Sequence, residues 1–310
     1  MSNWKTYKNG NYTVKINLDN GTKIKETKDD EFISDFATNI DIKICNRCDM
    51  VCSFCHEGST PDGKLGDILN EKFIETLHPY QEIALGGGNV LEHPDLIAFL
   101  RKLKNKKVIT NITLHQIHFE ENVDLIERLV NEKMVYGIGV SLMVATDDFI
   151  QKIRKFPNAI IHVINGIVTE NDINKLSNHG LKLLILGYKH LRRGDEWYKK
   201  VKLHIDLSQE WLKKELPNVL NKFEVVSFDN LAIEQLNVRS LLTNEEWEEF
   251  YAGEEGSSTF YIDMVERKFA KNSTASFDKR YDLLDSVDEM FHVIKNEVSK
   301  RIFRKMFKNY

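Results

Sequence analysis

The chain of 310 residues has little cysteine, and what it has lies in one place. All four cysteines fall between Cys45 and Cys55. A disulfide framework distributes its cysteines so that distant segments can be joined, and disulfides are rare in reducing compartments. The clustering therefore argues against a disulfide-stabilised scaffold and indicates a metal site.

The sequence also lacks long apolar runs and an excess of either charge. No stretch approaches the roughly 18 apolar residues needed to span a bilayer, and the first eleven residues are polar. The 43 basic and 47 acidic residues are interspersed, which gives no electrostatic footprint for nucleic acid or for an anionic membrane. We therefore expect a cytoplasmic protein with neither partner, and charge does not specify the substrate.

The hydrophobic pattern divides the chain into three parts. Residues 1–35 contain two Asn-Gly pairs around an alternating segment, which predicts an N-terminal β-meander. Residues 36–230 alternate short apolar strands with longer helical segments, as parallel βα units do. The expected strands are 40–44, 82–85, 108–114, 136–142, 159–164, 181–186 and 223–228, and the expected helices lie near 71–79, 94–105, 121–132, 147–155, 170–178 and 208–221.

We therefore predict an α/β fold built on a partial (β/α)6-type TIM-like barrel, with its chemistry at the C-terminal ends of the strands. Pro217 should start or kink the last of these helices. The alternation ends after residue 230, so residues 231–310 are expected to form a C-terminal appendage. Within it we expect a hairpin over 259–270 and a helix that a capping box of Ser286 and Glu289 opens.

Three of the cysteines follow the first expected barrel strand with the spacing C-x-x-x-C-x-aromatic-C. They are Cys48, Cys52 and Cys55, and Phe54 is the aromatic residue. Thiolates this close on one loop can bind three corners of a single [4Fe-4S] cube, whereas an electron-transfer cluster normally has a fourth thiolate. No distant cysteine supplies one, so one iron would be left open. Cys45 lies outside the spacing and is predicted to be a buried free thiol.

Two other interpretations of the four cysteines remain open. Together they could form a structural zinc site, although zinc modules usually combine ligand pairs from separated positions. They could also hold an electron-carrier cluster with Cys45 as the fourth ligand, which requires Cys45 and Cys48 to leave strand geometry. A zinc-loaded protein would be colourless, and a carrier would give a redox signal that no small ligand changes.

A glycine run follows the second expected strand. It reads Gly86-Gly87-Gly88-Asn89, and His93-Pro94-Asp95-Leu96 then opens a helix. Consecutive glycines allow the backbone to approach a ligand closely. The run lacks the G-x-G-x-x-G spacing of a dinucleotide site.

The cysteine spacing, its place after the first strand and the glycine run after the second resemble the radical S-adenosylmethionine (SAM) superfamily over roughly residues 38–230, including uncharacterised members from bacteria and phages. The resemblance implies that SAM chelates the open iron of a [4Fe-4S] cluster. It also implies that reductive cleavage of SAM yields a 5'-deoxyadenosyl radical, which abstracts hydrogen from an unidentified substrate. An external one-electron donor such as flavodoxin or ferredoxin would be the partner.

The resemblance also suggests cofactor contacts. Phe54 is expected near the adenine, and the glycine run near the SAM amino group, although Gly88-Asn89 stands where the family usually has glutamate. Ser141, Asn165 and Gly187, at or near the ends of strands four to six, are expected around the rest of SAM. No catalytic residue is predicted. Other polar residues expected near the barrel mouth are His115, His118, His162, Tyr188, Lys189, Arg192, Arg193, Asp229 and Glu234.

Overall fold

The computed structural model describes residues 3–251 and 253–306, with side chains as far as residue 297. Its N-terminal part is a three-stranded antiparallel sheet of β1 (Trp4–Asn9), β2 (Tyr12–Asn17) and β3 (Lys23–Glu26). Gly10 and Gly21, the glycines of the two Asn-Gly pairs, have φ of +60° and +77°. Glycine adopts such angles without steric cost, and the predicted meander is confirmed.

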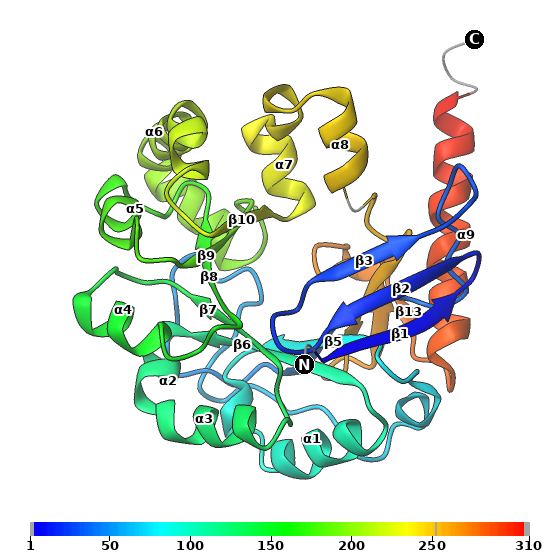
Figure 1. The fold of residues 1–310 in the computed structure, drawn as a ribbon. Helices are drawn as coiled ribbons and strands as arrows, with labels where there is room; N and C mark the ends of the chain where they lie inside the picture. The colour runs from blue at the N-terminus through cyan, green and yellow to red at the C-terminus, as the bar shows by residue number, and fades with distance from the viewer. Residues whose placement is uncertain (1–2, 252, 307–310) are drawn as a thin grey trace.

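The main sheet begins with seven parallel strands in sequence order (Figure 1). They are β4 (Asn39–Cys45), β5 (Glu82–Gly87), β6 (Ile109–His115), β7 (Gly137–Ser141), β8 (Ala159–Ile164), β9 (Lys182–Leu186) and β10 (Val225–Phe228). All seven predicted strands are present, so the α/β class is confirmed. The sheet is not closed, because β10 lies at one edge and β13 at the other.

Helices around the outside of the sheet connect these strands (Figure 1). They are η1 (Lys72–Thr76), η2 (Val90–Glu92), α1 (Leu96–Asn105), α2 (Gln116–Glu121), α3 (Val123–Asn131), α4 (Asp147–Ile153), α5 (Glu170–Leu176) and α6 (Arg193–Leu220). α6 starts well before the predicted residue 208. Its backbone is interrupted at Val201 (φ −127°, ψ 28°), whereas Pro217 lies inside the helix, so the prediction that Pro217 starts or kinks it was wrong.

Residues after β10 extend the main sheet. β11 (Thr259–Asp263) pairs in parallel with β4, and β12 (Lys268–Ala270) pairs antiparallel with β11, which confirms the predicted hairpin. β13 (Tyr281–Asp282) completes that edge. The remaining elements are α7 (Asn230–Leu236), η3 (Val238–Leu241), α8 (Asn244–Phe250), η4 (Phe277–Lys279) and α9 (Val287–Met306). The C-terminal region therefore places a strand directly beside the strand that precedes the cysteine loop.

The alternation of side chains along β4 separates the core from the opposite face of the sheet. Ile40, Ile42 and Ile44 are fully buried in the hydrophobic core. The alternate residues Asn39, Asp41 and Lys43 border a cavity on the inner side, as the two-residue period of a strand requires. The inner face of β4 is therefore polar, and the cavity lies on that side of the strand.

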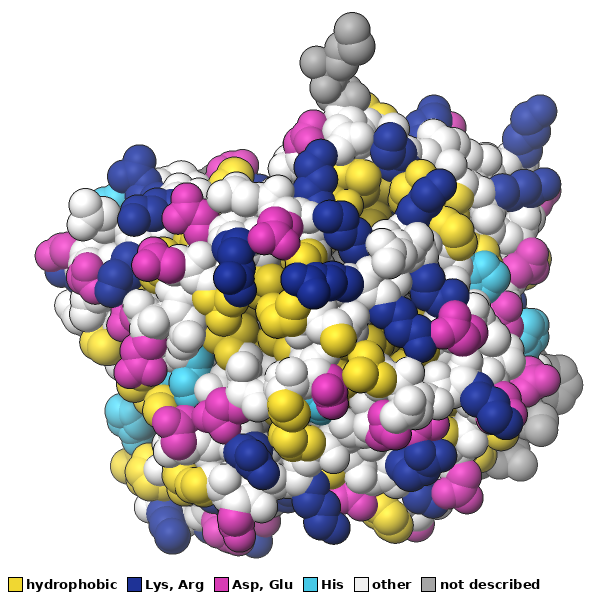
Figure 2. All heavy atoms as spheres, turned by 90° about the horizontal axis from the view of Figure 1, so that it is seen from below, with side chains coloured by type: hydrophobic (Ala, Val, Ile, Leu, Met, Phe, Trp, Pro, Cys, Tyr) yellow, Lys and Arg dark blue, Asp and Glu magenta, His cyan; other side chains and the backbone are white. Residues whose placement is uncertain are grey.

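The outer surface carries charges of both signs. On the face shown in Figure 2, Lys and Arg side chains are interspersed with Asp and Glu. Among the described residues, no helix has the length and apolar character needed to cross a membrane.

Candidate functional site

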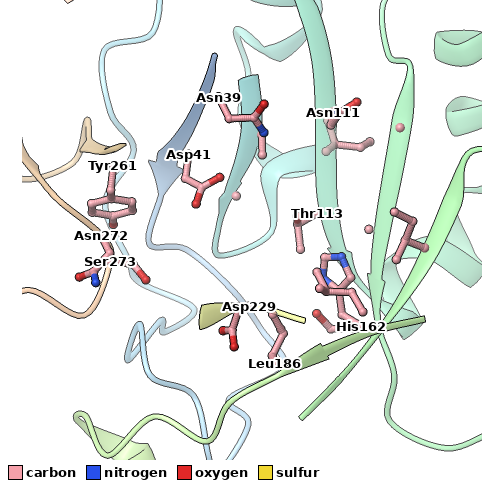
Figure 3. Close-up of a pocket in the computed structure, with 18 of the residues that line it drawn as sticks. Asn39, Asp41, Asn111, Thr113, His162, Leu186, Asp229, Tyr261, Asn272 and Ser273 are labelled. Atoms are coloured by element: carbon pink, nitrogen blue, oxygen red, sulfur yellow. The ribbon is translucent and has the colours of Figure 1, made fainter. Parts of the chain in front are cut away.

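A cavity of about 1230 Å³ lies against the inner face of the main sheet (Figure 3). Its wall includes the cysteine loop, the glycine run, inward-facing residues of β4 to β9 and the segment after β12. Pockets for one small ligand occupy roughly 300–1,000 Å³. The volume therefore suits more than one small ligand.

Three of the four cysteines border this cavity. Cys48, Cys52 and Cys55 are partly exposed and line its wall. Cys45 is fully buried at the end of β4, and burial raises the pKa of its thiol to about 11. The donor set facing the cavity is thus three thiols on one loop, which fits a [4Fe-4S] cube with one iron free of protein ligands.

Hydrogen bonds to the backbone hold the cysteine loop in place. The Cys48 amide donates to the Thr60 carbonyl at 2.8 Å. Arg193, at the start of α6, donates to the carbonyls of Cys52 (3.0 Å) and Ser59 (2.8 Å). Arg192 donates to the His56 carbonyl at 2.7 Å. The two arginines, which the sequence suggested for the mouth of the barrel, therefore bind the loop.

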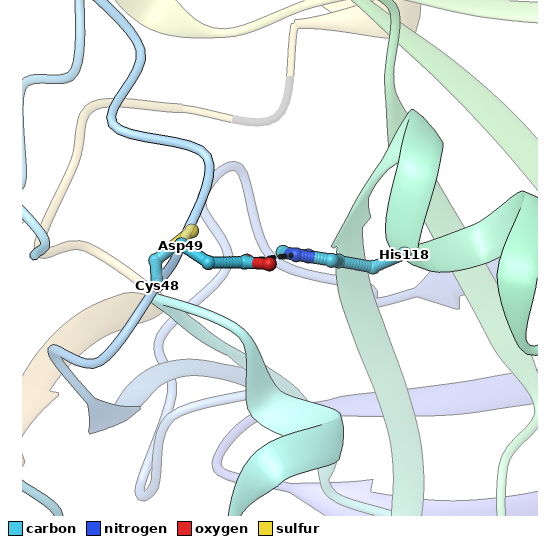
Figure 4. Close-up of side chains that lie close together, drawn as sticks. All are labelled: Cys48, Asp49 and His118. Carbon is cyan, nitrogen blue, oxygen red and sulfur yellow. Dashed lines mark hydrogen bonds and ion pairs between the residues drawn. The ribbon is translucent and has the colours of Figure 1, made fainter. Parts of the chain in front are cut away.

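An imidazole–carboxylate contact joins the same loop to α2 (Figure 4). His118 Nε2 lies 2.7 Å from Asp49 Oδ1, with His118 buried and Asp49 exposed. The hydrogen bond from His118 lowers the pKa of the Asp49 carboxyl. Ligand atoms of Cys48, Asp49 and His118 lie within 4.8 Å of one another. Zinc accepts these donor types, but a single ion here would leave Cys52 and Cys55 unused.

A buried charge network fixes the residues after Cys55. Lys43 Nζ lies 3.0 Å from Glu57 Oε2 and 3.3 Å from Asp263 Oδ2. Arg280 Nη1 also contacts Asp263 Oδ2, at 3.1 Å, and His56 Nε2 lies 3.3 Å from Glu57 Oε1. Burial alone raises the pKa of Glu57, but the hydrogen bonds and charges of His56 and Lys43 outweigh it and lower that pKa. The network links the cysteine loop to β4 and β11.

The glycine run packs directly on the cysteine loop. A Cβ on Gly87, whose φ is +117°, would lie 2.2 Å from the Cys45 carbonyl oxygen, and one on Gly88 would lie 2.0 Å from that of Arg47. A Cβ on Gly86 would meet no atom closer than Thr113 Cβ at 4.0 Å. Glycine is therefore needed at positions 87 and 88 so that the backbone of the run can lie against the backbone of Cys45 and Arg47, whereas Gly86 faces open space.

The structure separates the predicted SAM contacts into two groups. Phe54, Gly86, Gly87, Gly88, Ser141 and Gly187 line the cavity together with the three cysteines. Asn89 and Asn165 are buried away from its wall. Asn89 caps η2 by accepting from the Leu91 amide, and Asn165 Nδ2 donates to Gln235 Oε1 at 3.0 Å. These two asparagines have structural partners within the protein.

The N-terminal sheet closes the other end of the cavity, which the sequence did not reveal. Residues of the turn between β2 and β3, including Leu18 and Gly21, line it beside the first residues of the parallel strands. Lys23 forms an ion pair with Glu82 on β5 and donates to Asn39 Oδ1 on β4 at 3.1 Å. The meander is thereby attached to the N-terminal ends of the strands.

Comparisons with known proteins identify the fold. No family model matches the chain, and no curated protein matches it in sequence. Among solved structures, it is similar to Streptococcus suis SuiB bound to S-adenosylmethionine, with a TM-score of 0.60 and 12% identity over 91% of this chain and 85% of SuiB. SuiB bound to its precursor peptide SuiA gives a TM-score of 0.59 and 12% identity over 93% and 87%. The chain therefore has the fold of SuiB along most of its length.

Proposed function

We propose that this protein is a radical SAM enzyme whose Cys48, Cys52 and Cys55 hold a [4Fe-4S] cluster. The observation that carries the proposal is that these three cysteines, and not Cys45, line one cavity together with the glycine run. The shared fold supports it, since SuiB is a radical SAM enzyme and was crystallised with S-adenosylmethionine. When bound, the cluster and SAM supply the radical that removes hydrogen from substrate.

The residues of this chain then position the reactants and exclude water. The backbone of Gly86 to Gly88 would bind SAM, and Phe54, Ser141 and Gly187 would form the wall around it. Arg193 and the Lys43 network hold the loop that carries the three cysteines at the cavity wall. The open parallel sheet acts as a partial TIM-like barrel, and an external donor such as flavodoxin or ferredoxin supplies the electron.

The test is cluster assembly in single cysteine variants. Anaerobically reconstituted protein should hold about four irons per chain, since three clustered thiolates suit one cube. Cys48→Ala, Cys52→Ala and Cys55→Ala should each lose the cluster, while the matched control Cys45→Ala keeps it. Saturating SAM should also change the electron paramagnetic resonance spectrum of the reduced cluster.

Each alternative has its own signature in this experiment. Loss of iron in Cys45→Ala, with retention in one of the other variants, would show that the ligand assignment is wrong. A spectrum indifferent to SAM would favour an electron carrier. A colourless zinc protein that loses its metal in His118→Ala would instead identify the Cys48, Asp49 and His118 group as the metal site.

A further inference from the structure

We propose that the part of the cavity away from the cysteine loop binds a substrate with a protonated amine or guanidinium group, and that Asp41 is the ionic partner of that group. This inference rests on the proposed function, because it leaves the cysteine end of the cavity to SAM. It assigns a chemical class to the substrate, which neither the cysteines nor the fold specify.

Strand register brings the residues of this region together. Asp41 on β4 pairs with Ala84 on β5, which pairs with Asn111 on β6, which in turn pairs with Gly137 on β7. Residues at matching positions of neighbouring parallel strands point to the same face. Asp41, Ala84, Asn111 and Gly137 thus form one row across the inner face of the sheet.

Glycines on β7 make room for polar side chains in this row and the next. A Cβ on Gly137 would lie 2.6 Å from Asn111 Oδ1, and a Cβ on Gly139 would lie 2.3 Å from the His162 ring. The side chains of Asn111 and His162 therefore occupy space that a side chain at position 137 or 139 would fill. Figure 3 shows Asn111, Thr113 and His162 on the wall of the cavity, with Asp41 pointing into it.

These polar groups lack protein partners. Among the residues that the structure describes, no hydrogen bond or ion pair involves the side chain of Asp41, Asn111, Thr113 or His162. Asp41 is exposed and the other three residues are half-buried, so their polar atoms are open to a ligand that enters the cavity. A polar ligand could form hydrogen bonds with these groups, whereas an apolar ligand that displaced water from them would leave them without hydrogen bonds.

The charges around Asp41 favour a cationic ligand. Lys43, the cation on the same face of β4, is already paired with Glu57 and Asp263. Lys189 donates to Ser273 Oγ at 3.3 Å, and in the described part of the chain no basic side chain lies within ion-pair distance of Asp41. Burial lowers the pKa of His162 to about 4, so this ring is neutral at physiological pH and adds no competing positive charge.

The carboxyl group of Asp41 has a raised pKa, which a neighbouring cation would lower. Burial raises the pKa of Asp41 to about 6, and the charge of Glu255 adds to this while that of Lys189 opposes it. Asp41 is therefore ionised at neutral pH but poorly compensated. A guanidinium or ammonium group would supply the missing charge and a charge-assisted hydrogen bond, roughly twice as strong as a neutral one.

The test compares ligands that differ only in charge. SAM-loaded holoenzyme is titrated with N-acetyl-arginine methylamide and with its neutral isostere N-acetyl-citrulline methylamide, and binding is measured by calorimetry. We expect the arginine derivative to bind about tenfold more tightly, as one charge-assisted contact allows. Asp41→Asn should abolish this preference, and so should Asp41→Ser if the asparagine variant folds poorly. The control Glu127→Gln alters an exposed carboxylate on α3, remote from the cavity wall, and should retain it.

Two further measurements identify the kind of ligand and distinguish failure of this inference from failure of the proposed function. Agmatine presents the same guanidinium on a free small molecule, so preferential binding of agmatine indicates a small amine, and preferential binding of the blocked amino acid indicates a peptide. Iron content and the SAM-dependent spectrum are recorded on the same samples. If both are normal and the wild-type protein binds the arginine and citrulline derivatives equally, the inference is wrong while the proposed function stands. If the cluster or the SAM response is absent, the proposed function fails first.

Discussion

Lys43 Nζ lies between the carboxylates of Glu57 and Asp263, 3.0 Å from one and 3.3 Å from the other. All three side chains are buried. Breaking a buried ion pair completely costs about 3–5 kcal/mol, but without Lys43, Asp263 keeps its contact with Arg280 and Glu57 keeps its contact with His56. Lys43→Met should therefore lower the free energy of unfolding by a smaller amount, about 1–3 kcal/mol, in urea titrations.

The control for this variant is another lysine in an ion pair. Lys72→Met removes the 2.7 Å contact with Asp285, where both side chains are about three-quarters exposed. Exposed pairs contribute little, so its urea midpoint should match that of the wild type. Equal destabilisation by the two substitutions would show that the buried network has no special role.

Neighbouring glycines in the run should respond differently to alanine. Gly87→Ala places a Cβ 2.2 Å from a carbonyl oxygen at a φ of +117°. An alanine in this backbone conformation costs more than about 1 kcal/mol. We therefore expect a lower thermal midpoint and a cysteine loop that no longer packs in its native position. Gly86→Ala has room and should fold normally, but its methyl group faces the cavity and should weaken SAM binding. Thermal midpoints and SAM affinities measured side by side test both expectations.

The contact between His118 and Asp49 should affect how long iron is retained. A hydrogen bond to a charged group contributes about 1.5–3 kcal/mol when shielded, and less here because Asp49 is exposed. His118→Leu should therefore release iron to a chelator about three- to tenfold faster. His179→Leu changes an exposed histidine and should leave the rate unchanged. An unaltered rate in His118→Leu would mean that the loop is held by its backbone contacts alone.

Acid should destabilise the fold through His162. Burial lowers its pKa to about 4 in the folded protein, against an ordinary value of 6.5. Between these values the unfolded chain binds more protons, so stability is complete above about pH 6.5 and falls as the pH approaches 4. Circular dichroism melts from pH 7 to pH 5 should show a declining midpoint, and His162→Gln should show a smaller decline. Burial also lowers the pKa of His115 to about 4, so part of the decline should persist. Identical slopes in both proteins would contradict this assignment.

Local patterns sufficed to predict the strands but not all of their neighbours. The seven parallel strands each have a short apolar run with turn signals around it, and such runs are visible in any window of the sequence. The pairing of β11 with β4 joins residues more than two hundred positions apart. Nothing local in Thr259–Asp263 distinguishes a strand inside a sheet from one in a separate hairpin.

Local sequence patterns also identify only part of the site. The spacing of Cys48, Cys52 and Cys55 predicted their common location, because three residues on one loop are constrained by the chain itself. Asp41 is not identifiable in this way, since a polar residue alternating with isoleucines usually faces bulk solvent. Only the arrangement of the neighbouring strands and the meander places it in a cavity. Asn165 was chosen for its strand position, but its amide is bonded to Gln235 on α7.

The place of β4 between β5 and β11 also has a consequence for synthesis on the ribosome. β4 and the cysteine loop emerge early, but the strand that covers the other edge of β4 is made only at residues 259–263. At about 5–20 residues per second, that edge stays unpaired for on the order of ten seconds or more. An open strand edge can pair with other chains. The nascent protein is therefore most prone to aggregation after its cysteines appear and before its last strands do, so slowing translation in that interval should reduce the soluble yield.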